Sequence, residues 1–240
     1  MAAERVYVFQ HVACEDLGTF AEVLEHRGLQ VAYVRLFAGD SLPDDTAAAS
    51  VLVFLGGPMS VNDEGRYAYL AAEKATIRRA LVDAQPVLGV CLGAQLLAAA
   101  AGSRVFPGAR PEIGWAPLSL TMDGRQDAVL AGVADVAAVF HWHGETFDLP
   151  PTATRLAFSG LTMNQAFRIG RCAYGLQFHL EVTPGMIEAW LREYAADLGA
   201  DAVGIAGRIA DDTPVFAKTL RAAAETALNR FLDLAGAGIT

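Results

Sequence analysis

The chain has 240 residues, of which 53% are hydrophobic and 19% are charged, and this composition excludes intrinsic disorder. A chain of this length buries roughly three quarters of its unfolded surface, so it needs neither disulfides nor a metal to hold a core. The net charge of −9 gives no electrostatic footprint for nucleic acid or an anionic membrane. The three cysteines are an odd number, which indicates reduced thiols in a cytoplasmic compartment rather than a secreted disulfide scaffold.

Two segments decide whether part of the chain is addressed to a membrane. The start lacks a basic region followed by a long apolar run, so it is not expected to be a signal peptide. Residues 86–102 carry no charge, but they are short for a span of about 20 residues and are interrupted by glycines. A buried strand, a glycine-bounded turn and a buried helix explain them better. We therefore expect no membrane partner.

Short β-branched or aromatic runs alternate with helical patterns through the first hundred residues. The expected strands are 5–12, 30–37, 50–55 and 86–90, and the expected helices are 17–26, 67–83 and 94–101. The run at 50–55 is continuously apolar, which is typical of a central strand covered on both faces. Strands that alternate with helices predict βαβ crossovers and an open, mostly parallel sheet.

The pattern changes after residue 104. Residues 104–143 contain strand-like runs without obvious helices. Residues 164–180 predict a β-hairpin that turns at Gly170 and Arg171, because two apolar, aromatic runs flank that pair.

Two helices are expected at the C-terminal end, at about 184–236. Thr183-Pro184 and Thr213-Pro214 each supply an N-cap residue followed by proline, and Gly199 and Gly236 fit as the helix ends. Residues 200–212 have no strong period and are expected to form a loop. No repeat or linker divides the sequence, so we expect a single domain over residues 1–240.

The segment Gly89-Val90-Cys91-Leu92-Gly93 joins a predicted buried strand to a predicted helix. A residue at such a turn, with glycines two positions away on each side, fits a nucleophile elbow. The N-terminal N–H groups and dipole of the following helix favour a thiolate. The alternative is that Cys91 is a small buried residue, as most unpaired cysteines are.

A second pattern is the pair His179 and Glu181. In a strand these side chains point to the same face, where the carboxylate can orient the imidazole. An acid that orients a base is the second half of a nucleophile–base–acid triad. A solvent-exposed strand face with alternating polar residues is the alternative.

A third pattern is the glycine pair Gly56-Gly57, which follows the buried run 50–55. A glycine pair at a carboxyl strand end exposes backbone N–H groups where ligands of open α/β sheets bind. Taken alone it is a turn. His11 and Glu15 follow the first strand at the same edge, where they either line a pocket or serve as capping or solvent-exposed residues.

Together, GGPMS, GVCLGAQLLA and GLQFHLEVT resemble the motifs of the class I (triad) glutamine amidotransferase family, and the resemblance runs from Arg5 to about Thr183. It implies a three-layer α/β/α, flavodoxin-like fold and hydrolysis of the side-chain amide of glutamine. It also implies that Cys91 is the nucleophile, His179 the base and Glu181 the orienting acid.

The same resemblance implies the other members of the site. The backbone N–H groups of Gly57 and Leu92 correspond to the family's oxyanion hole. Its substrate-binding residues correspond here to Gln95, His143, Gly144 and Glu145.

The sequence departs from the family in two respects. Many members have proline between the His and the Glu, and here Leu180 occupies that position. No synthetase domain is attached within these 240 residues, so ammonia would pass to a separate synthase. Two other functions remain open: a γ-glutamyl peptide or amine hydrolase, and a non-catalytic regulatory subunit on the same scaffold.

No metal or organic cofactor is expected. His141 and His143 share one strand face and could act as metal ligands, but no third ligand follows at a recognisable spacing. The substrate is expected to be glutamine or a γ-glutamyl small molecule, and nucleic acid is not an expected partner.

Overall fold

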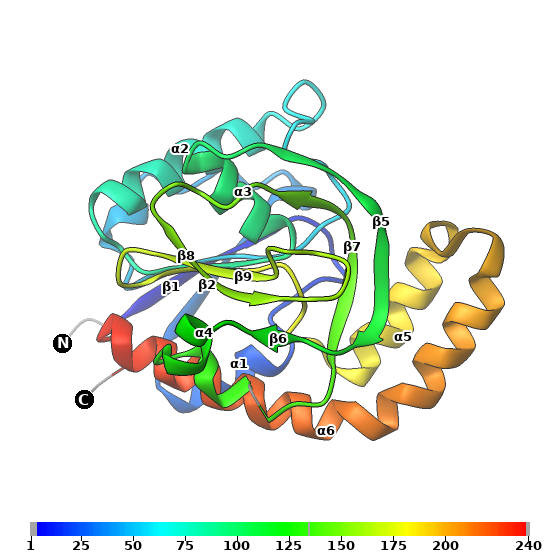
Figure 1. Cartoon of the computed structure of the whole chain (residues 1–240). Coiled ribbons are helices and arrows are strands. Elements are labelled where there is room, and N and C mark those ends of the chain that lie inside the picture. The colour runs from blue at the N-terminus through cyan, green and yellow to red at the C-terminus, as the bar shows by residue number, and fades with distance from the viewer. Residues whose placement is uncertain (1–3, 134, 239–240) are drawn as a thin grey trace.

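An eight-stranded sheet with the order β2-β1-β3-β4-β10-β9-β8-β6 forms the centre of the computed structural model, which describes residues 4–133 and 135–238 (Figure 1). The first three residues of the expected N-terminal segment lie outside these ranges. The strands are β1 (Arg5–Gln10), β2 (Gln30–Arg35), β3 (Val51–Phe54), β4 (Val87–Val90), β6 (Ser119–Leu120), β8 (Ala153–Phe158), β9 (Ala166–Ile169) and β10 (Ala173–Leu176). Strands β2, β1, β3, β4 and β10 run parallel, and β9, β8 and β6 extend the sheet antiparallel. The predicted mostly parallel sheet is therefore confirmed.

Helices cover both faces of this sheet, which gives three layers (Figure 1). Helices α2 (Tyr69–Val82) and α3 (Leu92–Ala100) lie on one face, and α1 (Thr19–His26) and α6 (Ala202–Ala235) lie on the other. Alternation along β1 divides the core: Val6 and Val8 pack with α1 and α6, and the next residues in each case, Tyr7 and Phe9, pack with α2 and α3. Each fully buried aliphatic or aromatic side chain contributes about 1.5–3 kcal/mol to folding.

A separate two-stranded antiparallel sheet stands at one end of the main sheet (Figure 1). It consists of β5 (Val105–Ala116) and β7 (Val139–Phe147), and an irregularity interrupts its register between Pro107 and Glu112. A short helix, α4 (Met122–Gln126), lies between them in sequence, in a region where no helix was expected. The predicted hairpin at Gly170 is confirmed, because β9 and β10 pair antiparallel on either side of this glycine.

The C-terminal helices agree with the sequence at three of four expected signals. Helix α5 (Pro184–Glu193) begins after Thr183, whose hydroxyl accepts a hydrogen bond from the Met186 N–H. Gly199 (φ 64°) breaks the helical geometry within the short 3₁₀ segment Ala195–Asp201, and Gly236 (φ 71°) ends α6.

The fourth signal, an N-cap at Thr213, is wrong, and so is the expected loop at 200–212. Helix α6 runs through both and contains Pro214 in its interior. Tertiary contacts offset the lost backbone hydrogen bond: Ile209 is buried in the core, and the indole N–H of Trp115 donates to the Thr213 hydroxyl at 3.0 Å.

Residues 86–102, the uncharged stretch, form β4 and α3 together with the turn between them. Within the described part of the chain, no helix has the length and apolar character needed to cross a membrane.

Candidate active site

Cys91 occupies a sharp turn between β4 and α3, with φ 51° and ψ −105°. The two flanking glycines are required by close backbone contacts. A Cβ atom on Gly89 would lie 2.4 Å from the Gly93 carbonyl oxygen, and one on Gly93 would lie 2.0 Å from the Phe54 carbonyl oxygen. The predicted elbow is therefore present, with a non-glycine residue held in the left-handed region at its centre.

His179 and Glu181 are in contact: the imidazole Nδ1 lies 2.7 Å from the carboxylate Oε1, and both side chains are buried. The expectation that they share a strand is wrong, because β10 ends at Leu176. Beyond that point the chain bends toward β7, and the His179 N–H donates to the carbonyl oxygen of Phe140 at 2.8 Å. The isolated bridge to Phe140 replaces the predicted strand as the element that positions the imidazole.

The surroundings of His179 favour its charged form. Burial acts to lower the pKa of this histidine, but attraction to Glu181 and Cys91 outweighs it and raises the pKa well above the ordinary value. The ring of Trp190 packs edge-on against the imidazole, with centroids 4.6 Å apart. The imidazolium is thus stabilised between a carboxylate and the Cys91 sulfur.

A cavity of about 470 Å³ lies over these residues, within the ~300–1,000 Å³ range of small-molecule sites. Its wall contains Cys91 and His179, together with the other residues for which a substrate or oxyanion role was expected and whose side chain or backbone reaches it: Gly57, Gln95, His143, Gly144 and Glu145. Four carboxylate residues line it, and no lysine or arginine does so among the described residues.

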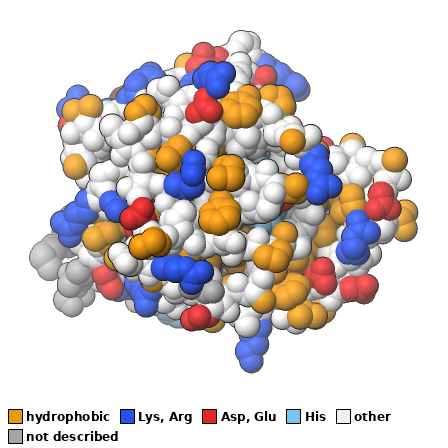
Figure 2. Space-filling model, viewed as in Figure 1, with side chains coloured by type: hydrophobic (Ala, Val, Ile, Leu, Met, Phe, Trp, Pro, Cys, Tyr) orange, Lys and Arg blue, Asp and Glu red, His pale blue; other side chains and the backbone are white. Residues whose placement is uncertain are grey.

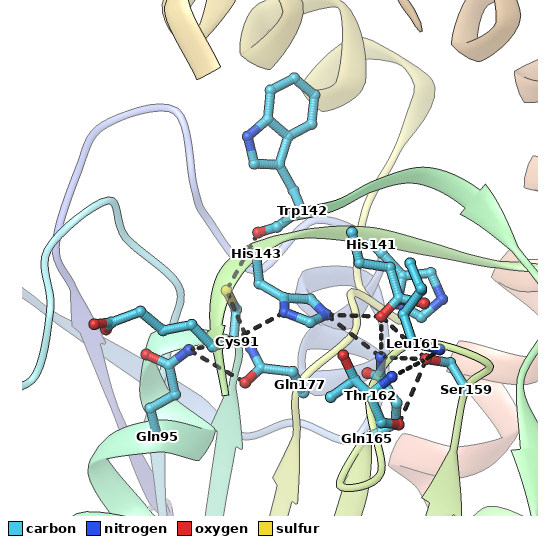
Figure 3. Close-up of polar contacts among 12 residues, drawn as sticks. Cys91, Gln95, His141, Trp142, His143, Ser159, Leu161, Thr162, Gln165 and Gln177 are labelled. Atoms are coloured by element: carbon cyan, nitrogen blue, oxygen red, sulfur yellow. Dashed lines mark hydrogen bonds and ion pairs between the residues drawn. The ribbon is translucent and has the colours of Figure 1, made fainter. Parts of the chain in front are cut away.

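Cys91 has two polar neighbours (Figure 3). Its Sγ lies 3.6 Å from the Trp142 carbonyl oxygen and 3.8 Å from the side-chain nitrogen of Gln177. The Gln177 carbonyl oxygen accepts a hydrogen bond from Gln95 Nε2 at 3.2 Å. Sequence reasoning missed Gln177, although it lies two residues before His179 within the same motif.

Gly57 and Leu92 lie close together beside the Cys91 turn. A Cβ atom on Gly57 would be 3.1 Å from Leu92 Cδ2, although 35 residues separate the two in sequence. Leu92 is the first residue of α3, so its N–H has no acceptor within the helix.

His11 is fully buried beneath this region and contacts two groups that only accept hydrogen bonds. Its Nδ1 lies 3.1 Å from the Gly56 carbonyl oxygen, and its Nε2 lies 3.0 Å from a carboxylate oxygen of the buried Glu73. Because both ring nitrogens must donate, His11 is an imidazolium. Burial acts to lower its pKa, but Glu73 outweighs burial and raises the pKa. In a trans peptide the N–H points opposite to the C=O, so this contact directs the Gly57 N–H away from His11.

Glu15 lies in the cavity wall beside the imidazole of His179, which decides between the two expectations for this residue. The Tyr194 hydroxyl donates to its carboxylate at 2.8 Å, and a Cβ atom on Gly56 would touch both Glu15 and His179. Burial raises the pKa of Glu15, and attraction to His179 only partly offsets this.

One group of described residues has the composition and spacing of metal ligands. Glu112, His141 and His143 offer ligand atoms that all lie within 4.8 Å of one another. The sequence spacing indicated only the two histidines, because Glu112 comes from β5, which is adjacent to them in space and not in sequence.

Comparison with known proteins agrees with this geometry. The family model of class I glutamine amidotransferase matches residues 17–194. The glutamine amidotransferase-like protein YfeJ of Salmonella typhimurium is 33% identical over 203 residues, which cover 83% of this chain and 84% of YfeJ. One of the subunits of the glutamine-hydrolysing GMP synthase of Ignicoccus hospitalis is 33% identical over 147 residues, 58% of this chain and 71% of that protein.

A crystal structure of a glutamine amidotransferase from Thermotoga maritima has the same fold. It superimposes with a TM-score of 0.82 at 31% sequence identity and covers 97% of this chain and 100% of that chain. The chain therefore belongs to the class I glutamine amidotransferase family.

Proposed function

We propose that this chain, acting as a single domain, hydrolyses the side-chain amide of glutamine or of a γ-glutamyl compound through a thioester on Cys91. The observation that carries the proposal is the 2.7 Å contact between His179 and Glu181 at the cavity that Cys91 lines. A nucleophile, a base and an orienting acid at one cavity are the parts that amide hydrolysis without a cofactor needs.

The Cys91 thiolate attacks the amide carbon and forms a C–S bond, and the carbonyl electron pair moves to oxygen. His179 then donates its proton to the departing nitrogen, so the C–N bond breaks and ammonia or an amine leaves. In the second half, His179 takes a proton from water, and the hydroxide released attacks the thioester to give glutamate and restore the thiolate. Glu181 holds the Nδ1–H tautomer throughout.

The oxyanion of both tetrahedral intermediates is stabilised by the N–H groups of Gly57 and Leu92. Loss of one such donor typically raises the barrier by about 2.7–4 kcal/mol. Gln95, His143, Gly144 and Glu145 hold the backbone end of the substrate, and their place in the cavity wall supports this.

A γ-glutamyl amine is the second candidate substrate, and the charge of the cavity favours it. Glu15 and Asp197 line the cavity along with the aromatic rings of Trp142, Trp190 and Tyr194, and no described basic residue does. Carboxylates and aromatic faces attract cations, so an amine leaving group that carries a second positive charge suits this wall.

The ammonia acceptor is proposed to be a separate synthase. The similarity to a GMP synthase subunit supports an arrangement in which glutamine hydrolysis and ammonia use reside on different chains. A partner of this kind would raise the rate of glutamine hydrolysis by the isolated chain.

The test measures glutamate and ammonia released by the purified chain from glutamine and from a panel of γ-glutamyl peptides and amines. Cys91→Ala should abolish hydrolysis and labelling by an electrophilic glutamine analogue. Cys172→Ala is the matched control, because that buried thiol contacts the Leu234 carbonyl and lies outside the cavity wall. Undiminished hydrolysis by Cys91→Ala would refute the mechanism, and an unreactive, unlabelled wild-type chain would favour a regulatory role instead.

A further inference from the structure

Glu112, His141 and His143 gather on one face of the β5–β7 sheet. In the antiparallel register Glu112 lies opposite His143, and Gly114 lies opposite His141. The two histidines are two residues apart in β7 and so point to the same face. All three side chains are buried, and His141 has no solvent-exposed surface at all.

His141 is the unusual member, because neither of its ring nitrogens has a hydrogen-bond partner among the described residues. A buried polar group left unpaired costs about 1–3 kcal/mol. The carboxylate oxygen Oε1 of Glu112 lies 4.0 Å from Nδ1, which is too far for a hydrogen bond. Two ligands that share a tetrahedral ion at about 2.0–2.1 Å lie roughly 3.4 Å apart, so a small inward movement would let one ion contact both.

His143 presents a second unsatisfied arrangement. Its Nδ1 lies 3.1 Å from the Glu145 carbonyl oxygen, and this contact places the ring proton on Nδ1. The lone pair on Nε2 then faces the Glu112 oxygen Oε2 at 3.4 Å, where two acceptors meet. The amide nitrogen of Gln165 stands 3.4 Å from the same Nε2, a long contact for a hydrogen bond. A cation between Nε2 and the carboxylate satisfies both.

The surroundings resemble the outer shell of a metal site. Ser159 and Gln165 donate to Glu112 Oε2 at 3.0 and 2.8 Å and so fix the carboxylate, as Figure 3 shows for their side chains beside His143. Burial lowers the pKa of His141 to about 4, so its imidazole is neutral at pH 7 and able to bind a metal.

From this geometry we propose that Glu112, His141 and His143 bind one divalent transition-metal ion. Two imidazoles and one carboxylate are a ligand set that Zn²⁺ accepts, with a water in the fourth position. The site is separate from the Cys91 chemistry. It connects to the cavity only through His143, which lines it, so the ion would fix the β7 side of the cavity wall.

The experiment measures metal content in a Cys91→Ala background, because a thiolate beside an imidazole would itself bind zinc. The protein is stripped with a chelator, loaded with equimolar Zn²⁺, passed through a desalting column and analysed by elemental mass spectrometry. We expect one zinc per chain. His141→Asn and Glu112→Gln should each reduce retained zinc at least tenfold, whereas His26→Asn, a change of an exposed histidine, should not alter it.

Loading with Co²⁺ supplies a second measurement, since a four-coordinate nitrogen and oxygen site gives intense visible d–d absorption. Glu112→Gln keeps the shape and the hydrogen-bond acceptor, and circular dichroism checks that each variant is folded. The proposal is overturned if the folded Cys91→Ala chain retains no zinc, or if His141→Asn and Glu112→Gln retain as much as their parent. Neither readout uses hydrolysis, so this result and that of the glutamine assay are independent.

Discussion

At the scale of single residues, His11 shows how a side chain that touches no substrate can support the chemistry. Its contact with the Gly56 carbonyl fixes the peptide whose N–H, on Gly57, is proposed to bind the oxyanion. Its positive charge also polarises that peptide, and Glu73 keeps the charge in place. His11 is therefore expected to be a positioning residue.

The variant His11→Asn should lower kcat for glutamine hydrolysis about tenfold or more and leave KM nearly unchanged. The reason is that the Gly57 N–H loses its orientation, and a whole oxyanion donor is worth about 2.7–4 kcal/mol. Alkylation of Cys91 by iodoacetamide forms no oxyanion, so its rate should stay the same. Steady-state kinetics and alkylation rates are measured on one preparation. If both rates fall together, His11 has a general structural role and not this one.

Glu181→Gln should change the pH dependence of hydrolysis. The charged groups that face His179 are Glu181, Cys91 and Glu15, and Glu181 raises its pKa most among them. The imidazolium is present below its pKa and is lost as pH rises through it, so loss of the carboxylate charge lowers this pKa.

The alkaline limb of the kcat/KM profile should accordingly move to lower pH in Glu181→Gln. The value of kcat should also fall, within the ~10²–10⁴-fold range of general acid–base catalysis. Glu188→Gln, an exposed change on α5, serves as the control and should leave the profile in place. An unmoved alkaline limb in Glu181→Gln would show that Glu181 does not control the protonation of His179.

At the scale of elements, the turn from β4 to α3 depends on the absence of two Cβ atoms. Gly93→Ala should lower the free energy of unfolding by about 1–3 kcal/mol or more, because the added carbon would overlap the Phe54 carbonyl oxygen of the neighbouring strand. Urea denaturation measures the change. Gly207→Ala, on the exposed side of α6 where no atom lies within 4 Å, should instead stabilise by up to about 1 kcal/mol. Equal effects of the two substitutions would contradict the role given to the turn.

Sequence reasoning succeeded where local pattern decides the structure. The strands β1 to β4, the helices between them and the hairpin at Gly170 follow from hydrophobic period and turn residues alone. It failed where tertiary contacts override local preference. Thr213-Pro214 has the pattern of a helix start, yet it lies inside α6 because Trp115 and the buried Ile209 hold that segment in helical form.

The candidate site divides in the same way. Cys91, His179 and Glu181 were predicted from motifs and a resemblance, and the structure brings them to one end of the sheet. Glu112, which approaches the β7 histidines across a strand pair, has no local signal. The same holds for Glu73, because helical spacing does not indicate that a glutamate will be fully buried against His11.

At the scale of the whole molecule, the cavity lies where three parts of the fold meet. The chain segments that follow β1, β3, β4 and β10 supply Glu15, Gly57, Cys91 and His179, and all four strands are parallel, so their carboxyl ends share one edge. The β5–β7 sheet and α5 complete the wall. On the face in Figure 2 charged side chains of both signs are scattered, whereas the cavity wall carries acidic groups only. The acidic character relevant to binding is thus local to the cavity.

The buried pair His11–Glu73 also affects the stability of the whole chain. The groups around His11 are Glu73 from α2, the more distant Glu15 and the Tyr69 ring. The folded state raises the pKa of His11 above the ordinary value of 6.5, so it holds a proton that the unfolded chain releases as pH rises. The stability from this pair is fully present below about pH 6.5 and is lost as pH rises through the raised pKa.

The double variant His11→Asn/Glu73→Gln removes both charges and leaves no unpaired ion in the core. The difference in unfolding free energy between wild type and this variant should therefore shrink steadily as pH increases from 6 to about 9. Urea denaturation at a series of pH values measures it, with His26→Asn, a change of an exposed histidine, as the control that should show a flat difference. A constant difference for the double variant would mean that His11 carries no more proton when folded than when unfolded, and the donor assignment to Gly56 and Glu73 would then be wrong.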